Sequence, residues 1–193
     1  MHLTQKQKKW NEAYTDADIA SATPALILKE NSYLLSNHGT ALDLACGRAG
    51  NAIFLAKHGY QVDAIDNSEV VLSHVQRYSE NKKLDINCIS RDIEEQGIDD
   101  KQYDVIVVSY FLSRKIINQI IQALKPDGLL FYQTWSQLSC DDKGPSNPNF
   151  RLEAEELLSL FKPLRPIFYR ENGLVGNLNE GLRNEAMLVA QRI

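Results

Sequence analysis

The chain has few cysteines and no long apolar run, and both shortages limit what it can be. Its three cysteines are an odd number without the spacing of a metal site, which predicts reduced thiols and a cytoplasmic protein. No apolar run approaches the roughly 20 residues of a membrane span. The lysines near the N-terminus lack the apolar segment of a signal peptide behind them. We therefore expect neither membrane attachment nor secretion.

Positive charge is not in excess either. The net charge of −4 argues against a general surface for nucleic acids or anionic membranes. The histidines form no metal pattern, so no metal site is expected; they are His2, His38, His58 and His74. With no repeat and no low-complexity tract, the 193 residues predict one domain, long enough for a sizeable core.

The chain does contain an alternation of apolar runs and helical stripes with short breaks. This pattern predicts an α/β fold with a doubly wound, mostly parallel sheet and helices on both faces. Strands are expected over 41–45, 61–66, 86–90, 104–108, 129–134, 165–170 and 186–191. Helices are expected over 24–35, 50–58, 116–124 and 153–161, with a further helix capped by Ser68.

The most informative segment reads Asp43-Leu44-Ala45-Cys46-Gly47-Arg48-Ala49-Gly50 and lies between the first expected strand and its helix. Small residues in such a turn let a ligand lie against the backbone, and an acid about 20 residues later holds ribose hydroxyls. Asp66, which ends the next apolar run, is such an acid. The segment therefore predicts a ligand that contains a nucleoside.

Asp43 favours one such ligand over another. At the end of the first strand we expect it to point toward the ligand crevice, where it would repel the pyrophosphate of a dinucleotide. S-adenosylmethionine carries no phosphate, and its ammonium and sulfonium groups would attract the carboxylate. The turn also lacks the third glycine of a dinucleotide site. An NAD-dependent oxidoreductase is therefore disfavoured, although nicotinamide binding would revive it.

At these residues the chain resembles the class I S-adenosylmethionine-dependent methyltransferases, in particular the small tellurite-resistance type. The matching segments are Asp43 to Gly47 as motif I, Asp66-Asn67 beside the ribose, Asp92-Ile93 beside the adenine, Tyr103 to Val108 as the fourth strand and Leu124 to Leu130 as the turn into the fifth. The resemblance covers most of the chain and departs at the third glycine of motif I, where Ala49 stands. The seven expected strands match the family's count (a Rossmann-like sheet), and the last two would form a C-terminal β-hairpin.

The resemblance also implies which residues contact the cofactor. They are Tyr14, Asp43, Ala45, Cys46, Gly47, Ala49, Asp66, Asn67, Asp92, Ile93 and Ser109. Residues 1–38 would form a helical lid over a cofactor-binding core of residues 39–193. For Tyr14 two interpretations stay equally open: it belongs to the lid over the cofactor, or it packs the N-terminal helix onto the sheet. For Trp10 we favour packing on the sheet. Loop 136–150 leaves the carboxyl end of the fifth strand, so we expect it over the acceptor site.

Methyl transfer is an in-line displacement that mainly needs a positioned acceptor and no water. Its catalytic residues therefore leave little trace in a sequence. Candidates at the right strand ends are Tyr110, Arg114 and Tyr132, and Arg114 would hold an anionic acceptor. The motifs of nucleic-acid methyltransferases are missing after the fourth strand, so a small-molecule acceptor is expected. Two alternatives stay open: a noncatalytic S-adenosylmethionine-binding module, and a methyltransferase that acts on RNA or protein.

Overall fold

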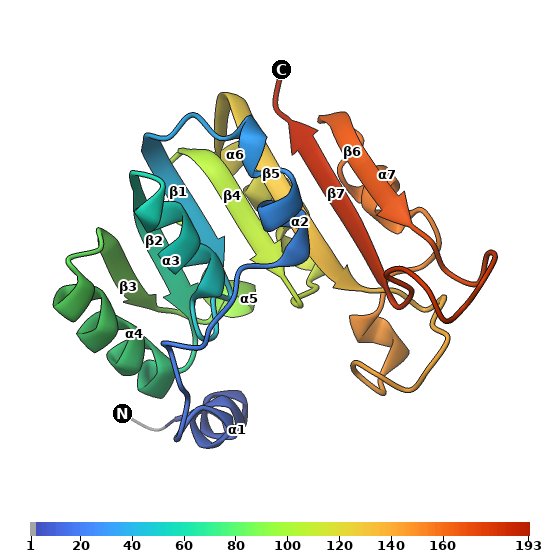
Figure 1. Cartoon of the computed structure of the whole chain (residues 1–193). Coiled ribbons are helices and arrows are strands. Elements are labelled where there is room, and N and C mark those ends of the chain that lie inside the picture. Colours follow the sequence, from blue (N-terminus) through green and yellow to red (C-terminus); the bar gives the residue numbers. More distant parts are fainter. Residues whose placement is uncertain (1–2) are drawn as a thin grey trace.

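Seven strands form one sheet in the order β3-β2-β1-β4-β5-β7-β6 (Figure 1). The computed structural model describes residues 3–193. In chain order the strands are β1 (Gly39–Leu44), β2 (Tyr60–Asp66), β3 (Ile86–Ser90), β4 (Tyr103–Ser109), β5 (Leu124–Trp135), β6 (Arg165–Glu171) and β7 (Glu185–Gln191). β7 runs antiparallel to both β5 and β6, and the other pairs are parallel. The expected doubly wound sheet with its C-terminal hairpin is therefore confirmed.

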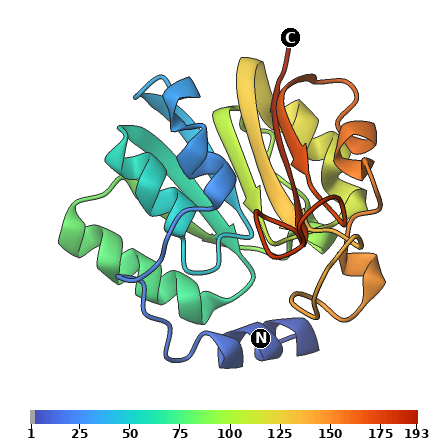
Figure 2. The ribbon, with the colours of Figure 1, turned by 45° about the vertical axis from the view of Figure 1, so that its right-hand side comes forward.

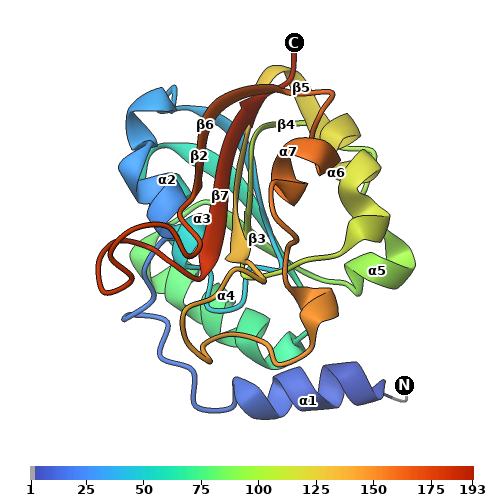
Figure 3. The same cartoon turned by 90° about the vertical axis from the view of Figure 1, so that its right-hand side faces the viewer.

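Helices cover both faces of this sheet, as Figure 3 shows from the side. α2 (Leu26–Glu30), α3 (Gly50–Lys57) and α4 (Glu69–Lys82) lie on one face; α5 (Ile93–Gln96), α6 (Ile117–Ala123) and α7 (Glu156–Leu160) lie on the other. Short 3₁₀ helices are η1 (Ser32–Leu34), η2 (Arg114–Ile116) and η3 (Pro148–Phe150). Each face has its own apolar core, with Ile27 and Leu55 in one and Ile120 and Leu157 in the other. Alternate residues of each strand feed the two cores, because side chains of a strand point to opposite faces in turn.

Local sequence explains where several helices begin and end. Ser68 caps α4, since its hydroxyl accepts a hydrogen bond from the Val71 amide at 3.3 Å. α3 ends at His58 and Gly59, where Gly59 takes a positive φ of 87°. β5 begins earlier than expected, at Leu124, because Leu124 pairs with Tyr103 ahead of an irregularity in the register.

α1 (Gln5–Ala13) stands apart from these layers, below the edge of the sheet at which the parallel strands end (Figure 2). It begins with a capping box, in which Thr4 and Gln7 exchange hydrogen bonds with each other's backbone amides. None of its nine residues, all of which the structure describes, is buried. α1 is therefore a cover laid on the carboxyl edge and not a part of either core.

Candidate functional site

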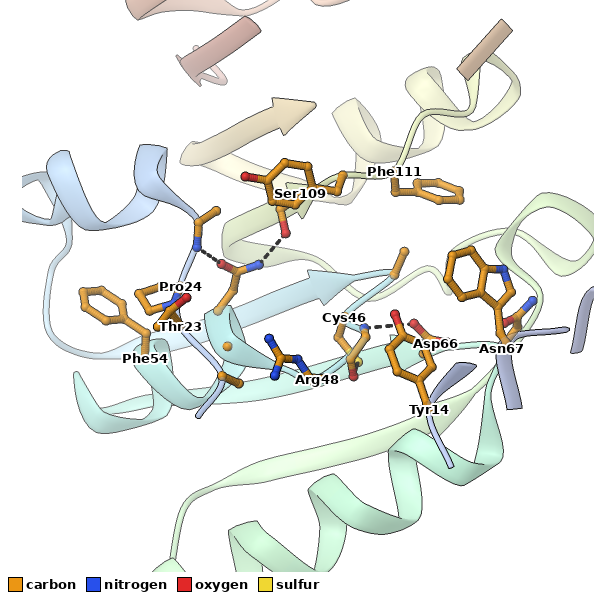
Figure 4. Close-up of a pocket in the computed structure, with 18 of the residues that line it drawn as sticks. Tyr14, Thr23, Pro24, Cys46, Arg48, Phe54, Asp66, Asn67, Ser109 and Phe111 are labelled. Carbon is orange, nitrogen blue, oxygen red and sulfur yellow. Dashed lines mark hydrogen bonds between the residues drawn. The ribbon is translucent and has the colours of Figure 1, made fainter. Parts of the chain in front are cut away.

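A cavity of about 860 Å³ opens at the carboxyl ends of β1, β2 and β4. This volume is in the range of small-molecule sites, and the carboxyl ends of parallel strands are where α/β folds bind ligands. Its walls come from α1, from the segment 22–29, from the turn between β1 and α3, and from the residues after β2, β3 and β4 (Figure 4). Of the expected cofactor contacts, these line it: Tyr14, Ala45, Cys46, Gly47, Asp66, Asn67, Asp92, Ile93 and Ser109.

The turn after β1 holds an unusual backbone. Ala45, Gly47 and Ala49 have positive φ values of 56°, 50° and 57°. Only glycine adopts this region freely, so the two alanines store strain of the kind that collects at functional sites. A Cβ on Gly47 would lie 2.8 Å from the Tyr14 hydroxyl oxygen, so a side chain there would fill the cavity floor. Gly47 thus presents backbone, and not a side chain, to a ligand.

Asp66 joins this turn to the end of β2. Its Oδ2 accepts the amide of Gly47 and its Oδ1 the amide of Ser68, each at 2.9 Å. Burial raises the pKa of Asp66, and the hydrogen bonds from backbone amides oppose that rise. A carboxylate offers about four acceptor positions, so two bonds leave room for the hydroxyls of a ligand.

Asp92 and Ile93 stand beside Asp66, at the end of β3. The Asp92 carboxylate caps α5 by accepting the Glu94 amide at 3.1 Å. The same carboxylate accepts Lys6 Nζ at 3.0 Å, and Lys6 also reaches Glu94 at 2.8 Å. Ion pairs between strand end and α1 therefore close this side of the cavity.

α1 contributes two aromatic rings to the cavity wall. Trp10 and Tyr14 stack with ring centroids 5.8 Å apart and planes inclined by 20°. Trp10 was expected to pack on the sheet, but it is 39% exposed and lines the cavity. Burial, and then the charge of Asp66, raises the pKa of Tyr14 to about 12. Tyr14 therefore stays a neutral hydroxyl beside Gly47.

Asp43 does not reach the cavity, so the expectation that it points into the crevice is wrong. Side chains alternate along β1, and position 43 falls on the face of α3. The carboxylate is fully buried, and it accepts the Asn51 side-chain amide at 3.1 Å and the Ala52 backbone amide at 2.9 Å. Burial raises its pKa to about 7. Ala49, likewise expected at the ligand, is buried at the start of α3 and is not part of the cavity lining among the described residues.

Arg114 and Tyr132 also lie away from the cavity. Arg114 forms a two-pronged ion pair with Glu156, with Nε–Oε1 at 2.6 Å and Nη2–Oε2 at 2.8 Å, and it donates to two carbonyls of the segment 149–151. Its planar guanidinium fits this paired geometry, so it fastens the chain ahead of α7. Tyr132 points to the opposite face of the sheet, where its hydroxyl donates to the Phe111 carbonyl at 2.8 Å. Neither side chain is placed to hold an acceptor at the cavity.

Loop 136–150 is separated from the cavity by two rings. Within the described chain none of its residues lines the cavity. Gly144 packs on Trp135, and the Trp135 ring lies 5.4 Å from that of Tyr110, which does line the cavity. Arg151 holds the loop by donating to the carbonyls of Pro145 at 2.8 Å and Ser136 at 3.0 Å. The wall expected from this loop comes instead from the segment 22–29.

Tyr110 is the candidate catalytic residue that the structure places at the cavity. It is half-exposed and has a positive φ of 54°, a strained conformation for a bulky residue. Its hydroxyl oxygen accepts the Gln133 side-chain amide at 3.1 Å. Burial, and then the nearby charge of Glu185, raises the pKa of Tyr110 to about 12. At neutral pH it therefore offers a hydrogen bond and is not ionised.

Two residues with amide side chains, Asn51 and Gln133, were not predicted from the sequence as site residues. Both are buried, and both connect the cavity walls to one another. Their signal was a polar residue in an otherwise apolar element: Asn51 opens the apolar helix α3, and Gln133 interrupts the apolar run of β5.

Neither a metal centre nor a membrane helix emerges from the described residues. Over 3–193, no three His, Cys, Asp or Glu side chains are grouped so as to hold a metal ion. His2 lies outside that range. Within the same range no helix has the length and apolarity to cross a membrane.

Comparison with known proteins points to one family. The sequence model described as "Tellurite resistance protein TehB" matches residues 6–184. "Probable S-adenosyl-L-methionine-dependent methyltransferase TehB" of Haemophilus influenzae is 29% identical over 137 residues, covering 68% of this chain and 48% of that protein. "Ubiquinone biosynthesis O-methyltransferase" of Coxiella burnetii is 28% identical over 135 residues, covering 66% of this chain and 57% of that protein. The chain thus spans about half the length of these curated relatives.

A solved structure gives the same result for the fold. The crystal structure of TehB from Haemophilus influenzae superposes with a TM-score of 0.74 at 22% identity, covering 95% of this chain and 67% of the other. A methyltransferase from Aquifex aeolicus superposes with a TM-score of 0.68 at 17% identity, covering 96% of this chain and 98% of the other.

Proposed function

Because the chain belongs to the TehB family of S-adenosylmethionine-dependent methyltransferases, we propose that it transfers a methyl group from S-adenosylmethionine to a small molecule bound in the same cavity. The observation that carries the proposal is the junction of Asp66 with the turn after β1. The Asp66 carboxylate accepts the Gly47 amide at 2.9 Å, and Gly47 has no side chain to fill the space beside it. This arrangement fits a ribose that lies against the backbone of the turn and is bonded by the acid.

The residues present fit the cofactor along the edge of the sheet. Asp66 would hold the ribose hydroxyls, and Asp92 with Ile93 would border the adenine. The turn from Ala45 to Gly47 would border the amino-acid part. The cofactor, when bound, supplies an electrophilic methyl group on a sulfonium whose leaving group is neutral. The chain therefore has no leaving group to protonate.

The residues of the chain would act by positioning and by excluding water, effects worth about 7–11 kcal/mol in well-oriented systems. Trp10 of α1 and Tyr14, the C-cap of that helix, would cover the cofactor end. Ser109, the last residue of β4, and Tyr110, directly after it, would border the space that remains. With a pKa of about 12, Tyr110 would orient an acceptor by a hydrogen bond and would not remove its proton.

A small acceptor agrees with the size and enclosure of the cavity. One space of about 860 Å³ would hold both the cofactor and the acceptor. The net charge of −4 offers no general attraction to nucleic acid. Among relatives, the names refer to ubiquinone biosynthesis and tellurite resistance, which are matters of small molecules.

Two measurements on the purified chain test the proposal. Calorimetry with S-adenosylmethionine, S-adenosylhomocysteine and NAD should show binding of the first two and none of the third. A turnover screen with radiolabelled methyl groups should then cover tellurite, selenite, thiols, phenols, amines and carboxylic acids. Tighter binding of NAD would defeat the cofactor assignment. Cofactor binding with turnover of tRNA or a protein alone would defeat the small acceptor, and binding with no turnover at all would identify a noncatalytic module.

A further inference from the structure

The two ends of the cavity are built from different parts of the chain. In Figure 4, Tyr14, Asp66 and Asn67 lie at one end, and Thr23, Pro24 and Phe54 lie at the other, with Arg48 and Cys46 between them. Asp66 marks the first end as the cofactor end under the proposed function. The second end, where the segment 23–29 faces Ser109 and Tyr110, is then the acceptor end.

Asn51 ties three separate elements together at this second end. Its Oδ1 accepts the backbone amide of Ala25 at 2.8 Å, and its Nδ2 donates to Asp43 at 3.1 Å and to Ser109 Oγ at 2.9 Å. The orientation of the amide is set by chemistry, because the backbone N–H of Ala25 can only donate and therefore faces Oδ1. With 4% of its surface exposed, Asn51 makes these bonds out of water, where they hold their partners firmly.

Gln133 repeats the same scheme from the neighbouring strands. Its Oε1 accepts the backbone amide of Ile27 at 2.8 Å. Its Nε2 donates to Glu185 at 2.6 Å and to the Tyr110 hydroxyl at 3.1 Å. Each amide thus joins one backbone N–H of the segment 23–29, one buried carboxylate, and one of the two consecutive hydroxyls at the end of β4, those of Ser109 and Tyr110.

The two backbone N–H groups explain why α2 needs these bonds. Ala25 and Ile27 stand at the start of α2, where helical N–H groups lack partners within the helix. In the described chain no side chain at the N-cap of α2 supplies a bond. Asn51 and Gln133 therefore cap α2 from other elements, at distances of 26 and 106 residues along the chain.

Gly50 brings the segment still closer to α3. A Cβ on Gly50 would lie 2.1 Å from the Thr23 carbonyl oxygen and 2.6 Å from its carbon, both backbone atoms. The backbone at Thr23 therefore rests directly on the first turn of α3. Any side chain at position 50 would push the segment away.

We propose that Asn51 and Gln133 are positioning residues of the methyl transfer: they fix the segment 23–29 as an immobile wall of the acceptor end and set its distance from Ser109 and Tyr110. The proposal rests on the proposed function for the assignment of the two ends. It predicts that acceptor recognition is rigid, whereas closure over the cofactor is confined to α1.

The test compares Asn51→Ala and Gly50→Ala with wild type and with Lys57→Ala, an exposed change on the same helix. Hydrogen exchange is read over 23–29 on the full chain, with and without S-adenosylhomocysteine. In the wild type and in Lys57→Ala, protection should be the same in both states. Both test variants should lose protection by at least about tenfold in that segment, while the strands stay protected.

Cofactor affinity supplies the second measurement. Calorimetry should find the dissociation constant of Asn51→Ala for S-adenosylhomocysteine within about threefold of wild type, because the hydrogen bonds that this variant loses lie at the second end of the cavity. For any acceptor found in the screen, its KM should rise by about tenfold or more while the KM for S-adenosylmethionine stays.

Three results would overturn the inference. One is unchanged protection of 23–29 in both variants. Another is protection in the wild type that appears only with S-adenosylhomocysteine, since the segment would then be a moving part. The third is a loss of cofactor affinity of about tenfold or more in a folded variant, which would assign Asn51 to the cofactor end. Failure of the proposed function gives a different result. The wild type would then not bind S-adenosylhomocysteine, and the hydrogen-exchange rates of the segment 23–29 would have no part in that outcome.

Discussion

α1 and α2 both cover the cavity from the N-terminal segment, yet different forces hold them. α1 has no buried residue in the described chain and is tied down by polar contacts, chiefly Lys6 with Asp92 and Glu94. α2 buries Ile27 and Leu28 completely and is bonded to two buried amides. The first contact set is solvated and screened by salt, and the second is not. One cavity therefore has a cover held by solvated polar contacts and a wall held by buried ones, and we expect only the cover to separate easily.

The difference also concerns where each helix receives its cap. α1 is capped by its own neighbours, Thr4 and Gln7, so its local sequence is sufficient to start it. The N-cap of α2 is Ala25, whose methyl side chain cannot accept a hydrogen bond, and the N–H groups of Ala25 and Ile27 are satisfied by Asn51 and Gln133. α1 therefore carries its own start signal, whereas the start of α2 depends on the rest of the protein being folded around it.

Truncating a buried side chain of the wall should have the largest effect. Ile27→Ala removes a fully buried side chain from the core of α2 and α3, and we expect it to lower the free energy of unfolding by about 2–5 kcal/mol. Trp10→Ala in α1 removes a larger but partly exposed ring and should change the free energy of unfolding by less than about 1 kcal/mol. Urea unfolding measures both. Equal losses would contradict the division into cover and wall.

Removing the acid beneath the cover should affect binding and leave the wall in place. Asp66→Ala deletes a charge-assisted hydrogen-bond acceptor, so affinity for S-adenosylhomocysteine should fall by about 1.5–3 kcal/mol. Asp66→Asn, which keeps the shape and loses the charge, should lie between this variant and the wild type. Titration calorimetry beside a thermal melt checks the prediction. Unchanged affinity in a folded variant would exclude Asp66 from the cofactor site.

The free energy of unfolding should depend on pH through a group of the wall, the buried Asp43. The pKa of Asp43, which anchors Asn51, is raised to about 7 by burial, whereas an unfolded aspartate titrates at about 4. The folded state therefore holds a proton between these pH values. The stability that Asp43 contributes is full below that window and is lost as pH rises through it, by up to about 1.4 kcal/mol per pH unit.

Asp43→Asn should remove this loss and flatten the stability of the protein between pH 4 and pH 7, roughly the interval between the two pKa values. Chemical unfolding at several pH values gives the slope for both proteins. A slope that survives in the variant would have to come from another group.

Loosening the cover should give the smallest change in stability. Lys6→Met breaks the ion pairs to both Asp92 and Glu94. Because the Lys6 side chain is 36% exposed, the free energy of unfolding should change by less than about 1 kcal/mol. Hydrogen exchange in α1 should nevertheless become faster, and high salt should produce the same effect in the wild type. If exchange in α1 were unaffected, the stacked rings of Trp10 and Tyr14 would be the dominant attachment.

The end of the cavity at Asp66 was more accessible to sequence reasoning than the end at the segment 23–29. Gly47 and Asp66 are 19 residues apart and belong to one strand-turn-helix-strand unit, so their pattern is readable in the chain. Nine of the expected contacts, including Asp92 and Ser109, accordingly line the cavity. Whether they bind the cofactor stays a prediction that the titrations decide, as does the expected cytoplasmic location.

The errors arose where the direction of a side chain mattered. Asp43 stands near the end of β1 as expected, but side chains alternate along the strand, and its side chain faces α3 and not the cavity. Arg114 was assigned an anionic acceptor because of its charge, yet Glu156, 42 residues away, already occupies its guanidinium. Loop 136–150 leaves the expected strand end, but the ring of Trp135 lies between it and the cavity wall.

By itself the sequence determined the order of the elements, the doubly wound sheet and the turn at Asp66, because periodicity and glycine-rich turns act over short stretches of chain. Only the tertiary structure decided which groups meet at the end of the cavity lined by the segment 23–29. Ala25 with Asn51, and Ile27 with Gln133, are 26 and 106 residues apart. No local pattern encodes such a pairing, since a buried amide is given its partners by the packing of the elements around it.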